Sequence, residues 1–398
     1  MIRNGKKPFE PQAGAVGMLA SLCLWGLLSV GPAACQPAPR YFAHLQSPPP
    51  QVCIAVFNPV VGTLQELDAL RREGLMPTSD ILVVGVYHEK ETGDYKAARR
   101  YVEEQGLEWV QFHALAGELS PENIYGENEC SNDFALIVRL TDGAILFGGP
   151  DIPPVCYGEE THLSTLIQDR YRHYTELSFV FHLLGGSQNK AHRPLLADAP
   201  DYVLLGICLG AQTINVATGG TLVQDIWQET YHTRTYEEVL RLGKERWHTN
   251  PFRRLYPEAG LLGYHLHPIK LSEGGLFCQV WGFSALQTPL VVSSHHQAVG
   301  KRGKGIAVAA TSADGRVVEA ITHTTFKNVL GVQFHPDFPI LWDANQQFRF
   351  VPGDTESSLR AILEANPPSM PFNRQVWTWF FSKATERRHV RLSAVGKP

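Results

Sequence analysis

The feature that most constrains this sequence is an apolar stretch that ends in a cysteine between two glycines. Residues 202–207 are expected to form a buried strand, which leads into Gly206-Ile-Cys208-Leu-Gly210 and then a helical run over 211–217. Glycines two residues either side of a nucleophile let the backbone turn sharply from strand to helix, as in the nucleophile elbow of hydrolases. We therefore predict an α/β fold with the Cys208 thiol exposed at the carboxyl end of a strand.

The position of Cys208 predicts a reactive thiol. At a helix N-terminus, the partial positive charge of the helix favours thiolate over thiol. The backbone N–H of Leu209, the next residue, would face the oxyanion that develops when a thiolate attacks a carbonyl. The alternative interpretation is a buried structural cysteine in a tight turn.

Short apolar segments alternate with longer helical ones along the chain. Strands are expected at 52–57, 81–87, 134–139, 144–147, 202–207, 290–293, 305–312, 317–322 and 329–334. Helices are expected at 63–73, 95–105, about 162–184, 211–217 and near 373–385. Strands that alternate with helices pair in parallel, so we predict a doubly wound, mostly parallel sheet flanked by helices in a single domain.

We place this domain at residues 52–398. Residues 185–200 are polar and contain Gly, Pro and Asn, which indicates a surface excursion. Residues from about 338 to 398 are expected to form a C-terminal extension that is irregular up to 371 and ends in the last helix.

The first 35 residues are expected to be an export signal. Basic residues precede an apolar run over 15–30, and small residues follow it. This order is typical of a secretory signal, and the run is shorter than the about 20 residues of a membrane span. The alternative is an anchor helix that is retained.

Cys35 follows two alanines, as in the lipobox of bacterial lipoproteins, so the signal could instead direct lipidation of Cys35 and anchoring to the membrane. Residues 36–51 are Pro-rich and are predicted to be a linker from the envelope to the enzyme. Export to the periplasm or envelope would leave five cysteines in an oxidising compartment, which permits two disulfides and one free thiol. We expect Cys208 to be the free one.

Composition narrows the classes of partner. A net charge of −4, with 44% hydrophobic and 19% charged residues, describes a globular protein without the basic surface of a nucleic-acid binder. We therefore expect a small-molecule substrate and no nucleic acid. The oligomeric state is left open.

A thiolate that attacks an amide needs a proton donor for the leaving amine, and histidine is the usual donor. Among 16 histidines, His335 stands out because a predicted strand delivers it to a turn forced by Pro336. Asp337 follows two residues later and could hold the imidazole in the required tautomer. Cys208, His335 and Asp337 are the predicted catalytic residues.

With these motifs, the chain resembles the class I glutamine amidotransferase-like superfamily over roughly residues 52–337. More narrowly, it resembles the γ-glutamyl hydrolase and γ-glutamyl-γ-aminobutyrate hydrolase branch. The resemblance is carried by five ordered motifs: Leu146-Phe-Gly148-Gly149-Pro150-Asp151, Gly206-Ile-Cys208-Leu-Gly-Ala-Gln212, Ser293-Ser-His295-His296-Gln297, Asp314-Gly-Arg-Val-Val-Glu319 and Gly331-Val-Gln-Phe-His335-Pro-Asp337.

The resemblance implies further roles. It assigns an oxyanion-hole N–H to Gly149, beside that of Leu209, and places Gln212, His295 and His296 near the substrate. The chain departs from the family in two places. Asp337 stands where the family usually has Glu, and Leu209 stands where this branch often has Arg, so a substrate-binding cation is lost there.

We therefore expect a cysteine-dependent hydrolase of γ-glutamyl amides or related small amides that works through an acyl-enzyme without a cofactor. The alternatives are a glutaminase subunit of an amidotransferase, and an envelope-anchored binding protein that has lost catalysis. No metal is expected. His232, His248, His265 and His267 were the candidates, but no Cys-x-x-Cys or His-Glu-x-x-His spacing supports zinc.

Overall fold

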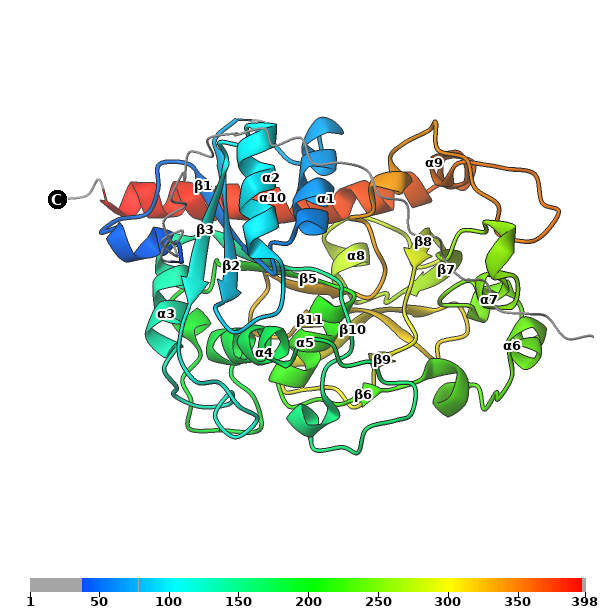
Figure 1. The fold of residues 1–398 in the computed structure, drawn as a ribbon, viewed down its shortest axis with the longest axis horizontal. Coiled ribbons are helices and arrows are strands. Elements are labelled where there is room, and N and C mark those ends of the chain that lie inside the picture. The colour runs from blue at the N-terminus through cyan, green and yellow to red at the C-terminus, as the bar shows by residue number, and fades with distance from the viewer. Residues whose placement is uncertain (1–37, 78, 396–398) are drawn as a thin grey trace, which may run out of the picture. The chain divides into compact units, whose positions relative to one another are not determined.

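A ten-stranded sheet forms the centre of the computed structural model, which describes residues 38–77 and 79–395 (Figure 1). Its order is β3-β2-β1-β4-β5-β12-β11-β10-β7-β8. The strands are β1 (Val52–Phe57), β2 (Ile81–His88), β3 (Val110–Leu115), β4 (Gly143–Leu146), β5 (Val203–Ile207), β7 (His265–Leu271), β8 (Leu290–Ser293), β10 (Ile306–Ser312), β11 (Val318–His323) and β12 (Val329–Val332). A separate pair joins β6 (Leu222–Val223) to β9 (Ala298–Val299).

The sheet changes character at β12. From β3 to β12 every neighbouring pair is parallel, whereas β12, β11, β10, β7 and β8 pair antiparallel. The parallel strands are continuous apolar runs because both of their faces are covered. The predicted doubly wound α/β fold with a strand-rich second half is confirmed.

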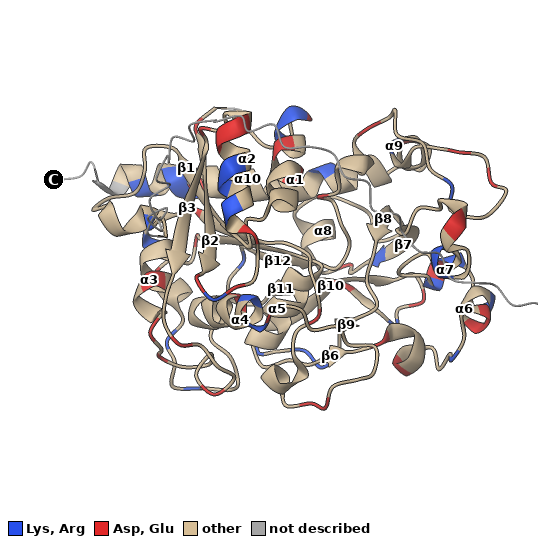
Figure 2. Cartoon of the chain, in the orientation of Figure 1, with Lys and Arg blue, Asp and Glu red and all other residues tan. Residues whose placement is uncertain are grey.

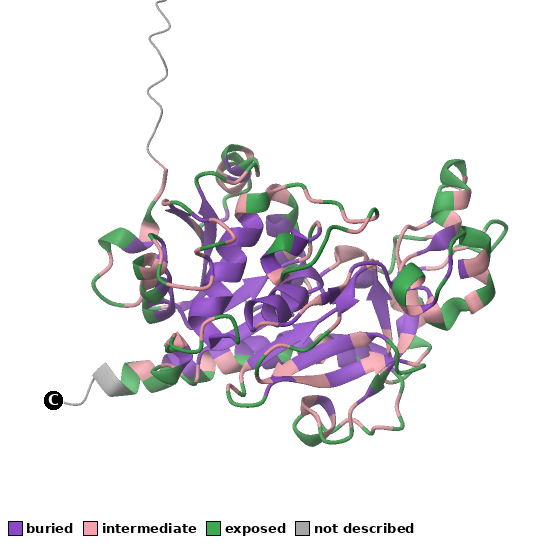
Figure 3. Ribbon diagram, turned by 90° about the horizontal axis from the view of Figure 1, so that it is seen from below, coloured by how far each residue is buried: buried purple, intermediate pink, exposed green. Residues whose placement is uncertain are grey.

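Helices cover both faces of the parallel half, and the strands are buried between them (Figure 3). One face packs against α1 (Val61–Arg72), α2 (Tyr95–Gln105) and α10 (Ser369–Val395), and α9 (Leu359–Glu364) packs against α10 beside the antiparallel half. The other packs against α3 (Ser131–Leu140), α4 (Arg170–Leu184) and α5 (Leu209–Ala217). Ile54 of β1 belongs to the first core and Ala55 to the second, as strand alternation requires.

Shorter helices lie beside the antiparallel half: α6 (Tyr236–Leu242), α7 (Pro251–Leu255) and α8 (Leu276–Gln279). Lys and Arg are interspersed with Asp and Glu along α1, α2 and α6 (Figure 2). None of the helices that the structure describes is both long enough and apolar enough to cross a bilayer.

Two secondary-structure predictions were wrong. Residues 134–139, expected as a strand, belong to α3, and their buried residues Phe134, Ile137 and Val138 follow helical spacing. The helix expected from about 162 begins only at Arg170, where Asp169 accepts a hydrogen bond from the Arg172 N–H. Strand β3 was not predicted at all.

The predicted linker 36–51 is largely part of the packed structure, because the compact unit begins at Ala38. Phe42 is fully buried and its N–H donates to His113 Nδ1 over 3.1 Å, while Arg40 forms an ion pair with Asp133. Residues 40 and 42 of the predicted linker thus contact the domain. The predicted signal, Cys35 and residues 36 and 37 lie outside the described residues.

The C-terminal extension completes the core rather than trailing from it. Helix α10 crosses the sheet, and Trp377 and Phe380 are fully buried against it. Trp377 Nε1 donates to the Pro336 carbonyl over 2.9 Å, next to His335. The cysteines at 53, 130, 156, 208 and 278 are all free thiols, so the disulfides that their number permitted are not formed among them.

Candidate active site

Three neighbouring parallel strands bring the predicted site residues together. Leu146 of β4 pairs with Gly206 of β5, and Ile207 of β5 pairs with Val332 of β12. The carboxyl ends of parallel strands meet at one edge of a sheet, so the segments that follow these three strands lie side by side. They carry the Gly148-Gly149 loop, Cys208 and His335.

Cys208 lies on a strained, tightly packed turn. Its φ is 52° and its ψ −105°, a conformation that L residues rarely adopt. A Cβ on Gly206 would lie 2.5 Å from the Gly210 carbonyl carbon, and a Cβ on Gly210 would lie 2.3 Å from the Leu146 carbonyl oxygen. The two glycines are therefore needed for close approach of α5 to the sheet. Cys208 is only 7% exposed, so the predicted exposed thiol is wrong.

His335 and Cys208 lie on either side of Gly148. A Cβ on Gly148 would lie 2.8 Å from His335 Cε1 and 3.6 Å from Cys208 Cβ. His335 Nδ1 lies 3.1 Å from Asp337 Oδ1, and the ring stacks on Phe338 with centroids 4.0 Å apart. Although Asp337 is one methylene shorter than Glu, it reaches the imidazole.

The electrostatics favour an imidazolium at His335. Burial lowers the pKa of His335, but the negative charges of Asp337 and Cys208, with their hydrogen bonds, raise this pKa to about 10. A protonated His335 can give its proton to the leaving amine of an amide substrate, and the Cys208 sulfur can act as the nucleophile.

Two residues that the sequence argument passed over also lie at this site. Gln333 donates from Nε2 to Cys208 Sγ over 3.6 Å. Glu66 of α1 is half-buried near Asp337, and burial and the charge of Asp337 raise the pKa of Glu66 to about 8. Gln333 was visible within the His335 motif, whereas nothing in the sequence connects Glu66 with a segment so far along the chain.

The Gly149 loop is fixed by a buried arginine. Arg172 donates from Nη2 to the carbonyls of Phe147 and Gly148, over 3.1 and 2.9 Å, and its Nε bonds Glu176 over 2.8 Å. A Cβ on Gly149 would lie 2.1 Å from Arg172 Nη1. Leu209 directly follows Cys208 at the start of α5, and Gly149 follows Gly148, where an added Cβ would lie 3.6 Å from Cys208 Cβ. The oxyanion-hole role of Leu209 and Gly149 stays a prediction.

Gln212 is buried and links two segments. Its Nε2 donates to the Gln297 carbonyl and to Gln333 Oε1, each over 3.3 Å. Through Gln333 it is connected to the sulfur of Cys208. Gln212 therefore positions Gln333, which in turn contacts the thiol of Cys208.

His296 and His295 point to different places. His296 Nε2 lies 3.0 Å from Asp151 Oδ2, and its Nδ1 lies 3.9 Å from Asp225. Burial lowers the pKa of His296, but hydrogen bonds to these two aspartates raise it to about 9. His296 lines a cavity of about 480 Å³ whose wall also includes Asp225, Arg234 and Arg254.

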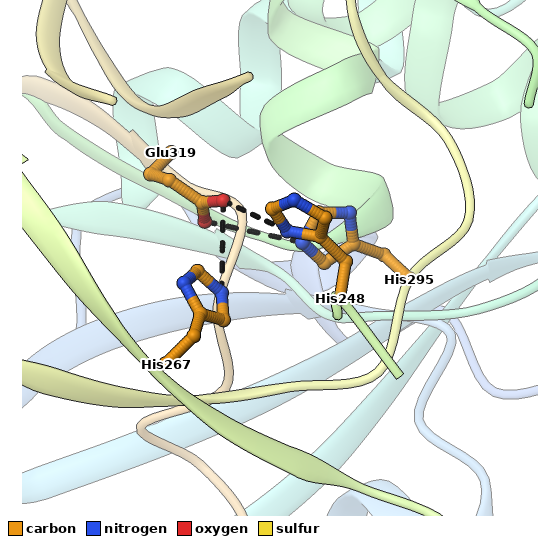
Figure 4. Close-up of side chains that lie close together, drawn as sticks. All are labelled: His248, His267, His295 and Glu319. Carbon is orange, nitrogen blue, oxygen red and sulfur yellow. Dashed lines mark ion pairs between the residues drawn. The ribbon is translucent and has the colours of Figure 1, made fainter. Parts of the chain in front are cut away.

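His295 instead belongs to a buried cluster with His248, His267 and Glu319 (Figure 4). One ligand atom from each residue lies within 4.8 Å of the others. No metal was expected at His248 and His267, because their local spacing matches no zinc motif, and His295 and Glu319 were not among the candidates. The four residues come from separate segments of the chain, so the absence of a local zinc motif does not exclude a metal here.

The chain is similar to several known proteins. The family model described as Peptidase C26 matches residues 83–337. The glutamine amidotransferase-like protein RP404 of Rickettsia prowazekii is 29% identical over 51% of this chain and 72% of its own length. The glutamine amidotransferase-like protein YvdE of Lactococcus lactis is 30% identical over 50% of this chain and 67% of its own length.

The glutamine amidotransferase Rv2859c of Mycobacterium tuberculosis is 31% identical over 48% of this chain. The match covers about half (49%) of the length of Rv2859c. A solved structure described as a GMP synthase subunit from Thermoplasma acidophilum covers 78% of this chain and 98% of its own. It is 15% identical to this chain, and the TM-score is 0.33. On the family match and these relatives, the chain belongs to the Peptidase C26 family, within the glutamine amidotransferase-like proteins.

Proposed function

We propose that this protein is a cysteine-dependent hydrolase of γ-glutamyl amides or related small amides. The observation that carries the proposal is the placement of Cys208 on a strained turn beside His335, with Asp337 3.1 Å from the imidazole. Nucleophile, base and orienting acid in this relation are the parts of a catalytic triad.

In the proposed reaction the Cys208 thiolate attacks the amide carbonyl carbon, and the N–H groups of Leu209 and Gly149 stabilise the oxyanion. As the C–N bond breaks, His335 gives its proton to the leaving amine. Neutral His335 then takes a proton from water while the water oxygen attacks the thioester. The C–S bond breaks, the γ-glutamyl group leaves as a carboxylic acid, and the thiolate and imidazolium are restored.

The cavity beside His296 supports a substrate that carries both charges of an amino acid. Asp225 offers an anion to an α-ammonium group, and Arg234 and Arg254 offer cations to an α-carboxylate. The two arginines are exposed and form no ion pair within residues 38–77 and 79–395.

A second candidate is a glutaminase that passes ammonia to a partner. It is favoured by the amidotransferase names of the Rickettsia and Lactococcus relatives. The two candidates share Cys208 chemistry and differ in whether a partner is required.

Hydrolysis of γ-glutamyl-p-nitroanilide and of glutamine, measured on the full chain, separates the candidates. The wild type and Cys278→Ala, which removes a partly exposed thiol elsewhere, should turn over, and Cys208→Ala should not. Glutamine hydrolysis that requires an added partner supports the amidotransferase. Ligand binding without any turnover supports a binding protein and would overturn the hydrolase.

We also propose that the enzyme acts in the periplasm or is anchored to the envelope. The support is the order of basic, apolar and small residues before Cys35. Cell fractionation of the wild type and Cys35→Ala tests this proposal. Lipid anchoring predicts that the substitution releases the protein from the membrane, and a wild type found only in the cytoplasm would contradict export.

A further inference from the structure

We propose that His248, His267, His295 and Glu319 bind one divalent transition-metal ion, with Zn²⁺ the best match. Imidazole nitrogens and a carboxylate oxygen are its common ligands in proteins. His248 lies in the loop before α7, His267 on β7, His295 in the loop after β8, and Glu319 on β11. This metal site is separate from the proposed active site at Cys208, whose chemistry requires no ion.

The distances between the donor atoms fit a single ion. His248 Nδ1 lies 3.2 Å and His267 Nε2 3.7 Å from Glu319 Oε1, and His295 Nε2 lies 3.9 Å from Glu319 Oε2. Ligands at about 2.0–2.1 Å from a tetrahedral zinc lie about 3.3–3.4 Å from one another. The donor atoms lie within 4.8 Å of one another, so the widest separations would have to close by up to about 1.4 Å for all four atoms to bind one ion.

The donor atoms are buried and lack hydrogen bonds. His248, His267 and Glu319 side chains are at most 1% exposed, and that of His295 is 2% exposed. The donor nitrogens and both Glu319 oxygens have no hydrogen-bond partner in the part of the chain that the structure describes. Figure 4 shows the rings of His248, His267 and His295 gathered around the Glu319 carboxylate, with the ion pairs marked as dashed lines. The contacts with Glu319 are close enough for ion pairs but form no hydrogen bond, and buried polar atoms without a hydrogen bond cost about 1–3 kcal/mol each.

Two histidines are oriented from behind, as metal ligands usually are. His295 Nδ1 lies 2.8 Å from the Gln297 carbonyl, and His267 Nδ1 lies 3.2 Å from the Pro268 carbonyl. A proton on each Nδ1 leaves the Nε2 lone pair for the ion. His248 is held by packing, since its ring lies against those of His267 and His295 at 4.8 and 4.9 Å between centroids.

Four protein ligands in a fully buried position leave none open for a substrate, which indicates a structural ion. Its effect would reach the thiol through the protein. The Gln297 carbonyl that orients His295 also accepts from Gln212, which bonds Gln333, the partner of Cys208. The ion would thus fix the loop behind the proposed nucleophile.

Metal content of the purified full chain tests the site independently of activity. Mass spectrometry of the elements should find about one zinc, or another first-row metal, per chain, and Co²⁺ added after chelation should give the visible absorption of a tetrahedral site. Cys208→Ala should bind the same amount, so a failure of the proposed hydrolase leaves this result intact.

Substitution of the ligands gives the contrast. His267→Gln and Glu319→Gln should lower bound metal at least about tenfold. His265→Gln is the matched control, because His265 lies two residues away on the same strand but bonds the Lys244 carbonyl. A wild type without bound metal, from growth in metal-supplemented medium and after added Zn²⁺, would overturn the site even if the variants fail to fold. Equal losses of bound metal in His265→Gln and His267→Gln would also overturn the proposed site.

Discussion

Gln333 donates a hydrogen bond from Nε2 to Cys208 Sγ over 3.6 Å, while its Oε1 accepts one from Gln212. The amide N–H therefore faces the sulfur that the proposed reaction uses as its nucleophile. Gln333 also immediately follows β12, the strand that leads to His335. One side chain thus ties the nucleophile to the segment that carries its base.

Replacing Gln333 with Leu should lower kcat/KM about 10- to 100-fold, since a hydrogen bond to a charged group contributes about 1.5–3 kcal/mol. The loss should be larger for Gln333→Glu, which places a negative charge beside the thiolate. Steady-state kinetics with thermal melts of both variants test this role. Folded variants with unchanged kcat/KM would show that the contact is incidental.

Asp337→Asn should change the pH profile as well as the rate. With Asp337 in place, the pKa of His335 is about 10, so the imidazole remains protonated at neutral pH and activity should fall only as pH rises through about 10. Without that charge, only Cys208 opposes the effect of burial, so the pKa of His335 should fall and the alkaline limb should move towards neutrality. We expect kcat to fall about 10²- to 10⁴-fold, by analogy with the loss of other orienting acids.

The control for Asp337 is Asp337→Glu, which restores the residue usual in the family. It should retain the alkaline limb near pH 10. Profiles of kcat/KM against pH for the three proteins measure this directly. An alkaline limb that is identical in the wild type and Asp337→Asn would mean that Asp337 does not control the His335 proton.

Two glycine-to-alanine changes should have opposite effects on stability. Gly210→Ala places a Cβ 2.3 Å from the Leu146 carbonyl oxygen, so α5 must move away from the sheet, at a cost of about 1–3 kcal/mol. Gly62→Ala in α1 meets nothing within 4 Å and should stabilise by about 0.5–1 kcal/mol. Denaturant unfolding of both checks the contrast, and equal stabilities would contradict the close packing at the cysteine turn.

His296 should contribute a pH-dependent part of the stability. Its folded-state pKa of about 9 lies above the ordinary value of about 6.5. Its stabilisation is therefore fully present below about pH 6.5 and is lost as pH rises through 9. Because a third of the side chain is exposed (34%), solvent screening reduces the contribution to about 1–2 kcal/mol.

The unfolding free energy of the wild type and His296→Gln, measured at pH 6 and at a pH of about 9.5, tests this linkage. The difference between the two proteins should be largest at pH 6 and nearly vanish at the higher pH. A constant difference would mean that the ring does not titrate between the two aspartates.

Strand β3, which contains Gln111 and His113, was missed. The rest of the parallel half could largely be predicted, because strands such as β1, β4 and β5 are continuous apolar runs. Helix α3 could not, since the short apolar run 134–139 satisfies either period until tertiary contacts decide. Cys208 and His335 were visible in local motifs at strand ends. Glu66 was not, because its nearness to Asp337 depends on how α1 packs against the sheet.

The histidine cluster shows the same limit more clearly. His248, His267, His295 and Glu319 are spread over some seventy residues without a regular spacing. Only the pairing of β7 with β8, in which His267 is opposite Val291, and the return of β11 across β10 bring them together. Motif spacing therefore finds metal sites within one element and misses those assembled between elements.

The central claim is that Cys208 carries the acyl group. Acid quenching of the wild type during turnover of γ-glutamyl-p-nitroanilide, followed by intact-mass measurement and peptide mapping, tests this most directly. We expect one γ-glutamyl group attached to Cys208 in the wild type. Cys208→Ala should show neither this adduct nor turnover. A wild type acylated at another residue, or turnover that survives in Cys208→Ala, would contradict it.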